Sequence, residues 1–171
     1  MLSVGYLHEL IIDHIGGNYK GVKIDYVIEE FPLGTGGSLL LGAQKIGLDK
    51  PFLVLNGDTY FTVNLEKLIA FSNIHNADWC FSLFTANETG RYMGMGISTQ
   101  GVITSLKSTT VQGGRLANGG VYWFHPRALH QIGFLPGDKC SLEEDIFPAA
   151  FALGRRVAPK ATKVAFLSFN S

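Results

Sequence analysis

A glycine-rich segment, "EEFPLGTGGSLLLGAQ" at residues 29 to 44, separates two stretches of different periodicity. Residues 22 to 28 alternate apolar and polar side chains, which predicts a strand. The following residues predict a helix over 38–46, with Ser38 as its N-cap and Gly47 near its end. A helix N-terminus offers backbone N–H groups, and glycine lets a ligand approach them closely. The segment therefore favours an anion or a nucleotide, and a connecting turn that needs positive φ is the equally weighted alternative.

Standard nucleotide motifs do not match this segment. A dinucleotide fingerprint would need glycine at Leu39, and a P-loop would need Lys followed by Ser or Thr after its last glycine. The type of ligand must therefore be inferred from the rest of the chain.

A carboxylate follows the apolar run "FLVL" at residues 52 to 55, which is typical of a strand buried on both faces of a parallel sheet. "NGDT" places Asp58 just past that strand, where α/β sheets bind their ligands, and Asn56 and Gly57 would form the turn that exposes it. Mg²⁺ prefers one or two carboxylates together with phosphates and water. Asp58 is thus a candidate metal ligand, with a plain N-G turn as the alternative.

Composition limits the class of protein. The chain has 171 residues, which suits one domain, and its net charge of zero gives no broad electrostatic case for nucleic acid or an acidic membrane. No apolar run is long enough to span a membrane, and the N-terminus lacks a signal-type pattern. Cys80 and Cys140 lack C-x-x-C spacing, which predicts reduced thiols in a cytoplasmic protein.

The elements that would position these residues alternate between strand and helix over residues 1 to 86, which predicts a parallel, doubly wound sheet. One helix ends at Gly16 and Gly17, with Leu7, Leu10, Ile11 and Ile15 on one face, and another has Asn64 as its N-cap. The second half predicts shorter elements: strands in "RYMGMGIS", "GVITSLKS", "NGGVYWFHP", "RRVAP" and "KVAFLSF", and a short helix in "PRALHQIG". In "CSLEEDIFPAAFALG", Ser141 and Glu144 predict a capping box, and Pro148 kinks that helix or starts a second one.

Five motifs follow one another in the order seen in the sugar-1-phosphate nucleotidyltransferases. The sequence most resembles the bacterial heptose-1-phosphate and mannose-1-phosphate guanylyltransferases. The five motifs are "EEFPLGTGGSLLLGAQ", "FLVLNGDTYFTVNLEKL", "RYMGMGIS", "NGGVYWF" and "CSLEEDIFP". The resemblance implies a three-layer α/β fold of nucleotide-diphospho-sugar transferase type, with a mostly parallel doubly wound sheet. It implies one domain over residues 1–171, with a nucleotide-binding half at 1–86 and a sugar-binding half at 87–171.

The same resemblance implies a reaction in which a sugar 1-phosphate attacks the α-phosphate of an NTP, giving an NDP-sugar and pyrophosphate. Asp58 would hold the Mg²⁺ that bridges the phosphates. The loop Gly34, Thr35, Gly36 and Gly37 would lie against the nucleobase and its ribose. The sugar site would consist of Asn118, Gly119 and Glu143. Two structural alternatives stay open: "NGG" shapes the start of a strand, and Glu143 serves the dipole of its helix.

Glu29 suggests which base is used. A carboxylate only accepts hydrogen bonds, and guanine offers adjacent N–H and NH₂ donors on its Watson–Crick edge. If Glu29 faces the base, GTP is favoured over UTP.

The sequence also departs from the family. The family's first strand with its G-G-x-G-T-R loop is missing, and so is its late D-I-G-T-P-like segment with a second metal Asp. The expectation is a fold truncated at both ends, whose exposed edge a homodimer or a swapped element would cover. Three accounts stay open: part of an active guanylyltransferase, a non-catalytic regulator that binds a nucleotide sugar, or a uridylyl- or cytidylyltransferase.

Overall fold

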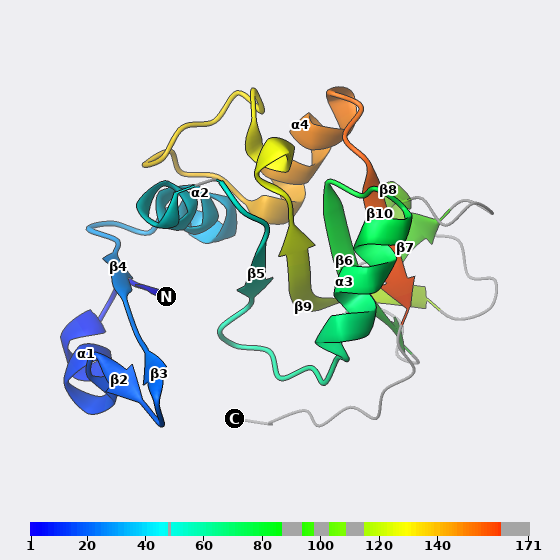
Figure 1. Ribbon diagram of the computed structural model, residues 1–171. Coiled ribbons are helices and arrows are strands. Elements are labelled where there is room, and N and C mark those ends of the chain that lie inside the picture. The colour runs from blue at the N-terminus through cyan, green and yellow to red at the C-terminus, as the bar shows by residue number, and fades with distance from the viewer. Residues whose placement is uncertain (48, 87–93, 98–102, 109–114, 162–171) are drawn as a thin grey trace. The chain divides into compact units, whose positions relative to one another are not determined.

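The computed structural model describes residues 1–47, 49–86, 94–97, 103–108 and 115–161 (Figure 1). The chain forms two compact units, each built from two segments. Unit 1 contains residues 1–49 and 131–149, and unit 2 contains residues 50–130 and 150–171. The predicted strand "KVAFLSF" lies outside the described residues.

Unit 1 begins with a small parallel sheet in which β1 (Leu2–Val4) pairs with β4 (Tyr26–Ile28). Between them come α1 (His8–Ile15), β2 (Asn18–Tyr19) and β3 (Val22–Lys23). The single strand predicted over 22–28 is wrong, because β3 pairs with β2 in an antiparallel hairpin whereas β4 pairs with β1. The segment therefore forms two strands with different partners. Its buried side chain is Val27, whereas Val22 and Ile28, on the apolar face that the sequence predicts, are exposed.

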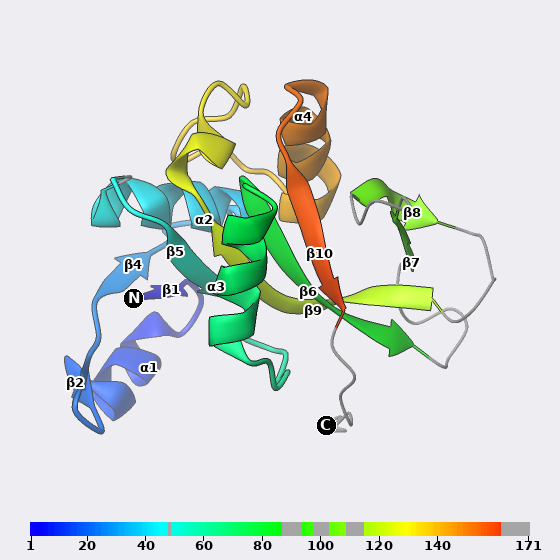
Figure 2. The same cartoon turned by 45° about the vertical axis from the view of Figure 1, so that its right-hand side comes forward.

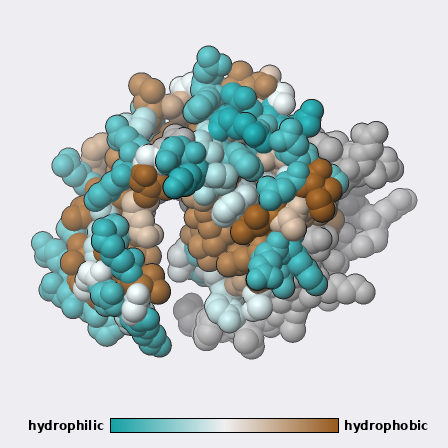
Figure 3. Space-filling view, in the orientation of Figure 1, coloured by the Kyte–Doolittle hydropathy of each residue, from teal (hydrophilic) through white to brown (hydrophobic). Residues whose placement is uncertain are grey.

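The helix α1 ends at Gly16 as predicted. Its apolar residues are only poorly covered: α1 has no buried side chain, and Leu10 and Ile11 are 62% and 37% exposed. Leu7 precedes the helix, with a φ of 58°. Figure 3 shows hydrophobic residues on the surface among hydrophilic ones.

Unit 2 contains a four-stranded sheet in the order β10 (Val157–Ala161), β6 (Trp79–Ala86), β9 (Arg115–Phe124), β5 (Phe52–Leu55) (Figure 2). β10 and β6 are parallel, whereas β9 is antiparallel to both β6 and β5. The sheet is therefore mixed. The prediction that β5 belongs to a parallel sheet is wrong, because β9, its described neighbour, runs in the opposite direction. The predicted burial on both faces is wrong as well, because no residue of β5 is buried and Leu55 is 61% exposed. A continuous apolar run thus determines neither the burial of a strand nor the direction of its neighbours.

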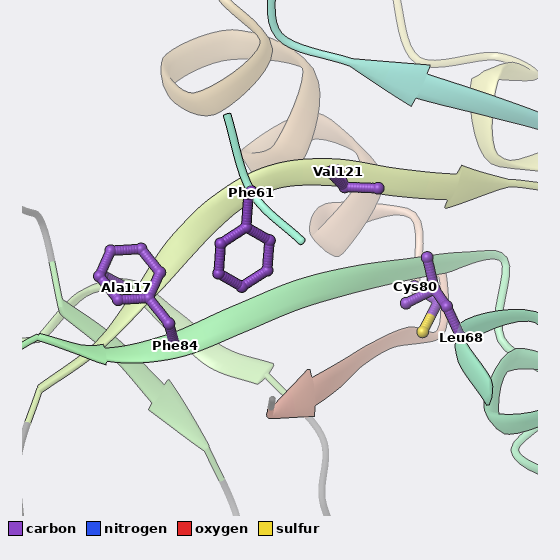
Figure 4. Packing of buried hydrophobic residues seen from close by; sticks show 6 residues of the cluster. All are labelled: Phe61, Leu68, Cys80, Phe84, Ala117 and Val121. Atoms are coloured by element: carbon purple, nitrogen blue, oxygen red, sulfur yellow. The ribbon is translucent and has the colours of Figure 1, made fainter. Parts of the chain in front are cut away.

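Part of the core of unit 2 lies between this sheet and α3 (Leu65–Ile74), which contacts β6, β9 and β10. Asn64 caps α3 as predicted, because its side chain accepts a hydrogen bond from Lys67 N at 2.9 Å. Figure 4 shows part of the core, a cluster of Phe61, Leu68, Cys80, Phe84, Ala117 and Val121. The predicted strands β7 (Gly94–Ile97) and β8 (Ile103–Ser108) pair in antiparallel orientation, and Pro126–Leu129 form a short 3₁₀ helix.

The segment after residue 140 starts with a π-helical turn (Leu142–Ile146) followed by α4 (Phe147–Ala152), so Pro148 lies at the start of a second helix. Ser141 caps the turn as predicted and accepts hydrogen bonds from the backbone of Glu143 and Glu144. Ser141 N in turn donates to Asp145 Oδ2 at 2.8 Å. The carboxylate of the capping box therefore comes from Asp145, whereas the sequence predicted Glu144. The cause is the wide turn, in which Ile146 N reaches Ser141 O at 3.1 Å.

Candidate functional site

The predicted site residues occur in both units. Unit 1 contains Glu29, Gly34, Thr35, Gly36, Gly37 and Glu143, and unit 2 contains Asp58, Asn118 and Gly119. In each unit, the chain brings together two of the motifs that are far apart in the sequence.

The glycine segment is the first turn of α2 (Gly34–Ile46), so the predicted helix start at Ser38 is wrong. Gly36 N and Gly37 N donate to Cys140 O at 3.0 and 3.2 Å. These two N–H groups of the helix N-terminus are thus used by a carbonyl of the same chain. Ser38 lies one turn further on, where its single hydroxyl hydrogen is shared between Gly34 O at 2.8 Å and Glu29 Oε1 at 2.5 Å.

The glycines also make close packing possible. Gly34 has a φ of +75°, and a Cβ on it would lie 2.7 Å from Cys140 O. A Cβ on Gly37 would lie 2.4 Å from Asp138 O. Gly36 and Gly37 are buried, whereas Gly34 and Thr35 are exposed. The predicted need for a positive φ therefore accounts for Gly34, whereas close packing accounts for Gly36 and Gly37. Direct contact of this loop with a nucleotide remains a prediction that rests on Gly34 and Thr35.

Thr35 links the glycine loop to the predicted sugar residue. Its hydroxyl accepts a hydrogen bond from Leu142 N at 2.8 Å and donates to Glu143 Oε2 at 3.1 Å. Ser141 Oγ lies 3.3 Å from the same carboxylate oxygen. The half-buried Glu143 is thus held in place by two hydroxyl groups, one of which comes from the predicted nucleotide loop.

Glu29 has a structural role that the sequence did not reveal. Its Oε1 accepts hydrogen bonds from Ser3 Oγ at 2.8 Å and Ser38 Oγ at 2.5 Å, and its Oε2 accepts one from Leu33 N at 3.1 Å. Burial raises the pKa of Glu29, but the three hydrogen bonds outweigh burial and hold the pKa below its ordinary value. A carboxylate has about four acceptor positions, two on each oxygen. Since Oε1 already accepts two hydrogen bonds and Oε2 accepts one, a guanine contact would have to use Oε2.

We expect Glu29→Gln to destabilise unit 1 by about 1–2 kcal/mol at neutral pH, because an amide offers one acceptor oxygen to three donors. Since folding lowers the pKa of Glu29, the unfolded chain binds its proton more readily. The stabilisation of the fold by the Glu29 carboxylate is complete above the ordinary pKa of about 4.3. It is lost as the pH falls through the pKa that Glu29 has in the folded protein. Urea denaturation should show that the free energy of unfolding declines less between about pH 6 and about pH 3 in the variant than in the unmodified chain. A parallel decline would contradict this role.

In unit 2, the turn that carries Asp58 is attached to β9. Asn56 N donates to Gly120 O at 2.9 Å, and Gly120 has a φ of +70°. Asp58 itself is exposed, and Thr59 Oγ1 donates to its Oδ1 at 3.1 Å. The turn after β5 that carries the predicted metal carboxylate is therefore joined by a backbone hydrogen bond to the predicted sugar motif "NGG" on β9. Sequence reasoning missed Gly120, although the doubled glycine was a signal for an irregular strand.

Asn118 and Gly119 lie at the start of the irregularity in β9. The pairing register of β6 with β9 shifts between Phe81 and Leu83, next to these residues. Gly119 is buried, and a Cβ on it would lie 2.6 Å from the Phe61 ring. Gly119 therefore shapes the strand, whereas the partly exposed Asn118 can present its side chain to a ligand.

The described residues contain no group of three or more His, Cys, Asp or Glu side chains that could hold a metal ion by themselves. The single carboxylate of Asp58 nevertheless fits Mg²⁺, which takes most of its ligands from phosphates and water. The chain's two cysteines, Cys80 and Cys140, are both described and form no disulfide. Burial raises the pKa of Cys140, and the carboxylates of Asp145 and Asp138 raise it further, so this thiol stays protonated.

Comparison with known proteins gives consistent results. The family described as nucleotidyl transferase matches residues 2–161. The chain is 33% identical over 151 residues to the D-glycero-alpha-D-manno-heptose 1-phosphate guanylyltransferase of Aneurinibacillus thermoaerophilus, covering 88% of this chain and 64% of that protein. It is 30% identical over 156 residues to the mannose-1-phosphate guanylyltransferase catalytic subunit beta of Dictyostelium discoideum, covering 89% and 43%.

A solved structure, HddC from Yersinia pseudotuberculosis complexed with GMP-PN, is similar with a TM-score of 0.76 at 30% identity. The similarity covers 94% of this chain and 68% of HddC. The chain thus spans less than two thirds of the length of the two curated relatives. In the part of the chain that the structure describes, no helix has the length and apolar character needed to cross a membrane.

Proposed function

Because the chain belongs to the nucleotidyl transferase family, we propose that it contributes to a sugar-1-phosphate guanylyltransferase, with heptose or mannose as the sugar. An oxygen of the sugar 1-phosphate attacks the α-phosphorus of GTP and forms a new P–O bond. The bond between the α-phosphorus and the bridging oxygen breaks, and pyrophosphate leaves. Two of the similar proteins are named as guanylyltransferases of these two sugars, which supports this choice of substrates.

The observation that carries the proposal is the arrangement of the predicted residues in two hydrogen-bonded groups. In unit 1 the glycine loop is joined to Glu143 through Thr35, and in unit 2 the turn of Asp58 is joined to the "NGG" strand through Gly120. Both groups combine motifs on which the resemblance to the family rests. Such chemistry depends mainly on positioning and on neutralising charge.

Each group has a proposed task. Gly34 and Thr35 contact the nucleotide, whose base interacts with Glu29, while Gly36 and Gly37 hold their loop in place. Asn118 and Glu143 bind sugar hydroxyls, and Gly119 shapes the strand that carries Asn118. Asp58 holds Mg²⁺, which would neutralise charge on the triphosphate. We place the reaction in the cytoplasm, and a homodimer remains a prediction.

The test is a calorimetric titration of the chain with GTP, UTP and CTP in the presence of Mg²⁺, followed by pyrophosphate release with heptose or mannose 1-phosphate. We expect GTP to bind at least about tenfold more tightly than UTP or CTP, a difference of about 1.4 kcal/mol. GTP binding without pyrophosphate release would favour the non-catalytic regulator. Tighter binding of UTP or CTP would favour the other base choices and contradict the proposal.

A further inference from the structure

The Asn118 side chain is held at both ends of its amide. Its Oδ1 accepts a hydrogen bond from Gly120 N at 3.0 Å, and its Nδ2 donates to the Tyr122 hydroxyl at 2.6 Å. A rotation of the amide by 180° would place an NH₂ group against the N–H of Gly120, which cannot accept a hydrogen bond. The N–H of Gly120, which can only donate, therefore fixes which end of the amide faces it, and the Tyr122 hydroxyl holds the other end with a second hydrogen bond.

This fixed orientation determines what Asn118 offers to a ligand. Within the described residues, Gly120 and Tyr122 use one acceptor position and one N–H of the amide, which leaves one acceptor and one N–H. Asn118 is partly exposed, whereas Tyr122 is completely buried, with 0% of its surface exposed. A hydroxyl-bearing ligand at Asn118 would thus meet one donor and one acceptor in fixed directions.

We propose that the Tyr122 hydroxyl is a positioning group that orients Asn118 for the hydroxyls of the sugar 1-phosphate. The inference rests on the proposed function, because it assigns Asn118 to the sugar. Tyr122 itself does not touch the substrate; it acts through the amide. It is therefore a positioning residue, and a buried tyrosine in this place has a task that phenylalanine could not fulfil.

The ring and the hydroxyl of Tyr122 can be separated experimentally. The ring packs edge-on against Phe81, with 5.3 Å between the ring centroids, and lies 6.2 Å from the Phe124 ring. Tyr122→Phe keeps these contacts and removes only the hydroxyl. Tyr26→Phe is a matched control, since it removes a hydroxyl that donates to Gly16 O at 2.7 Å in the other unit.

The experiment compares the unmodified chain, Tyr122→Phe and Tyr26→Phe by titration with mannose 1-phosphate, heptose 1-phosphate and GTP in Mg²⁺. We expect Tyr122→Phe to weaken binding of the preferred sugar phosphate about fivefold and to leave GTP binding within about twofold. Tyr26→Phe should change neither affinity. Equal sugar affinities of Tyr122→Phe and the unmodified chain would overturn the inference but leave the proposed function intact.

A second measurement does not depend on the substrate. The side-chain NH₂ signals of Asn118, assigned by their loss in Asn118→Asp, should differ in chemical shift and exchange rate between the unmodified chain and Tyr122→Phe. Unchanged signals would overturn the inference directly. A chain that shows the NMR effect but binds no sugar phosphate would contradict the proposed function, and with it the assignment of the oriented amide to the sugar.

Discussion

Gly37→Ala is expected to destabilise the protein by about 3 kcal/mol, because the added methyl group has no space. The Cβ would lie 2.4 Å from Asp138 O and 2.7 Å from Leu33 Cβ. Asp138 O belongs to the backbone, so the contact cannot be relieved by a side-chain rotation. The two segments of unit 1 would have to separate where Gly36 N and Gly37 N bind Cys140 O.

The matched control is Gly17→Ala in the same unit. No atom lies within 4 Å of the Cβ that would be added to Gly17, and Gly17 has no positive φ. Chemical denaturation of the two variants and the unmodified chain would measure the difference, and we expect Gly17→Ala to stay within about 0.5 kcal/mol. Equal stability of Gly37→Ala and Gly17→Ala would refute the packing role of the loop.

The α/β class and the fold of the family were predictable from the order of the motifs, and the similarity to HddC confirms them. Local signals were also reliable where one residue decides the outcome, as at Asn64 and Ser141. Strand partners were less predictable. The split of 22–28 and the antiparallel neighbour of β5 depend on segments distant in the sequence, and periodicity contains no information about them.

The sequence predicts which residues would form the candidate site, and that choice stays a prediction, but the sequence does not predict how these residues are arranged. "GTGG" and "SLEED" are each recognisable, yet only the structure brings the Thr35 hydroxyl to Glu143, 108 residues away. Similarly, Tyr122 reads in the sequence as one more aromatic residue of an apolar strand. Its role depends on the irregular geometry of Asn118 and Gly120, because a regular strand would turn the Asn118 side chain away from Gly120 N.

Asp58→Ala should have the largest effect on function. If Asp58 is the carboxylate that holds Mg²⁺, its removal should lower the rate of pyrophosphate release by at least about a hundredfold. The stability of the fold should change by less than about 0.5 kcal/mol, because Asp58 is exposed and its described hydrogen bond comes from the neighbouring Thr59. A large loss of activity with unchanged stability would separate a functional residue from a turn residue.

The metal role can be distinguished from a direct contact between Asp58 and the substrate by titrating GTP with and without Mg²⁺. Without Mg²⁺, Asp58→Asn should bind GTP as well as the unmodified chain does, or better, because a carboxylate repels phosphates. With Mg²⁺, the unmodified chain should gain affinity, and Asp58→Asn should gain much less. Asp49→Asn changes another exposed aspartate, outside the candidate site, and should behave like the unmodified chain. An equal gain in the unmodified chain and in Asp58→Asn would exclude Asp58 as a metal ligand and would favour the plain N-G turn.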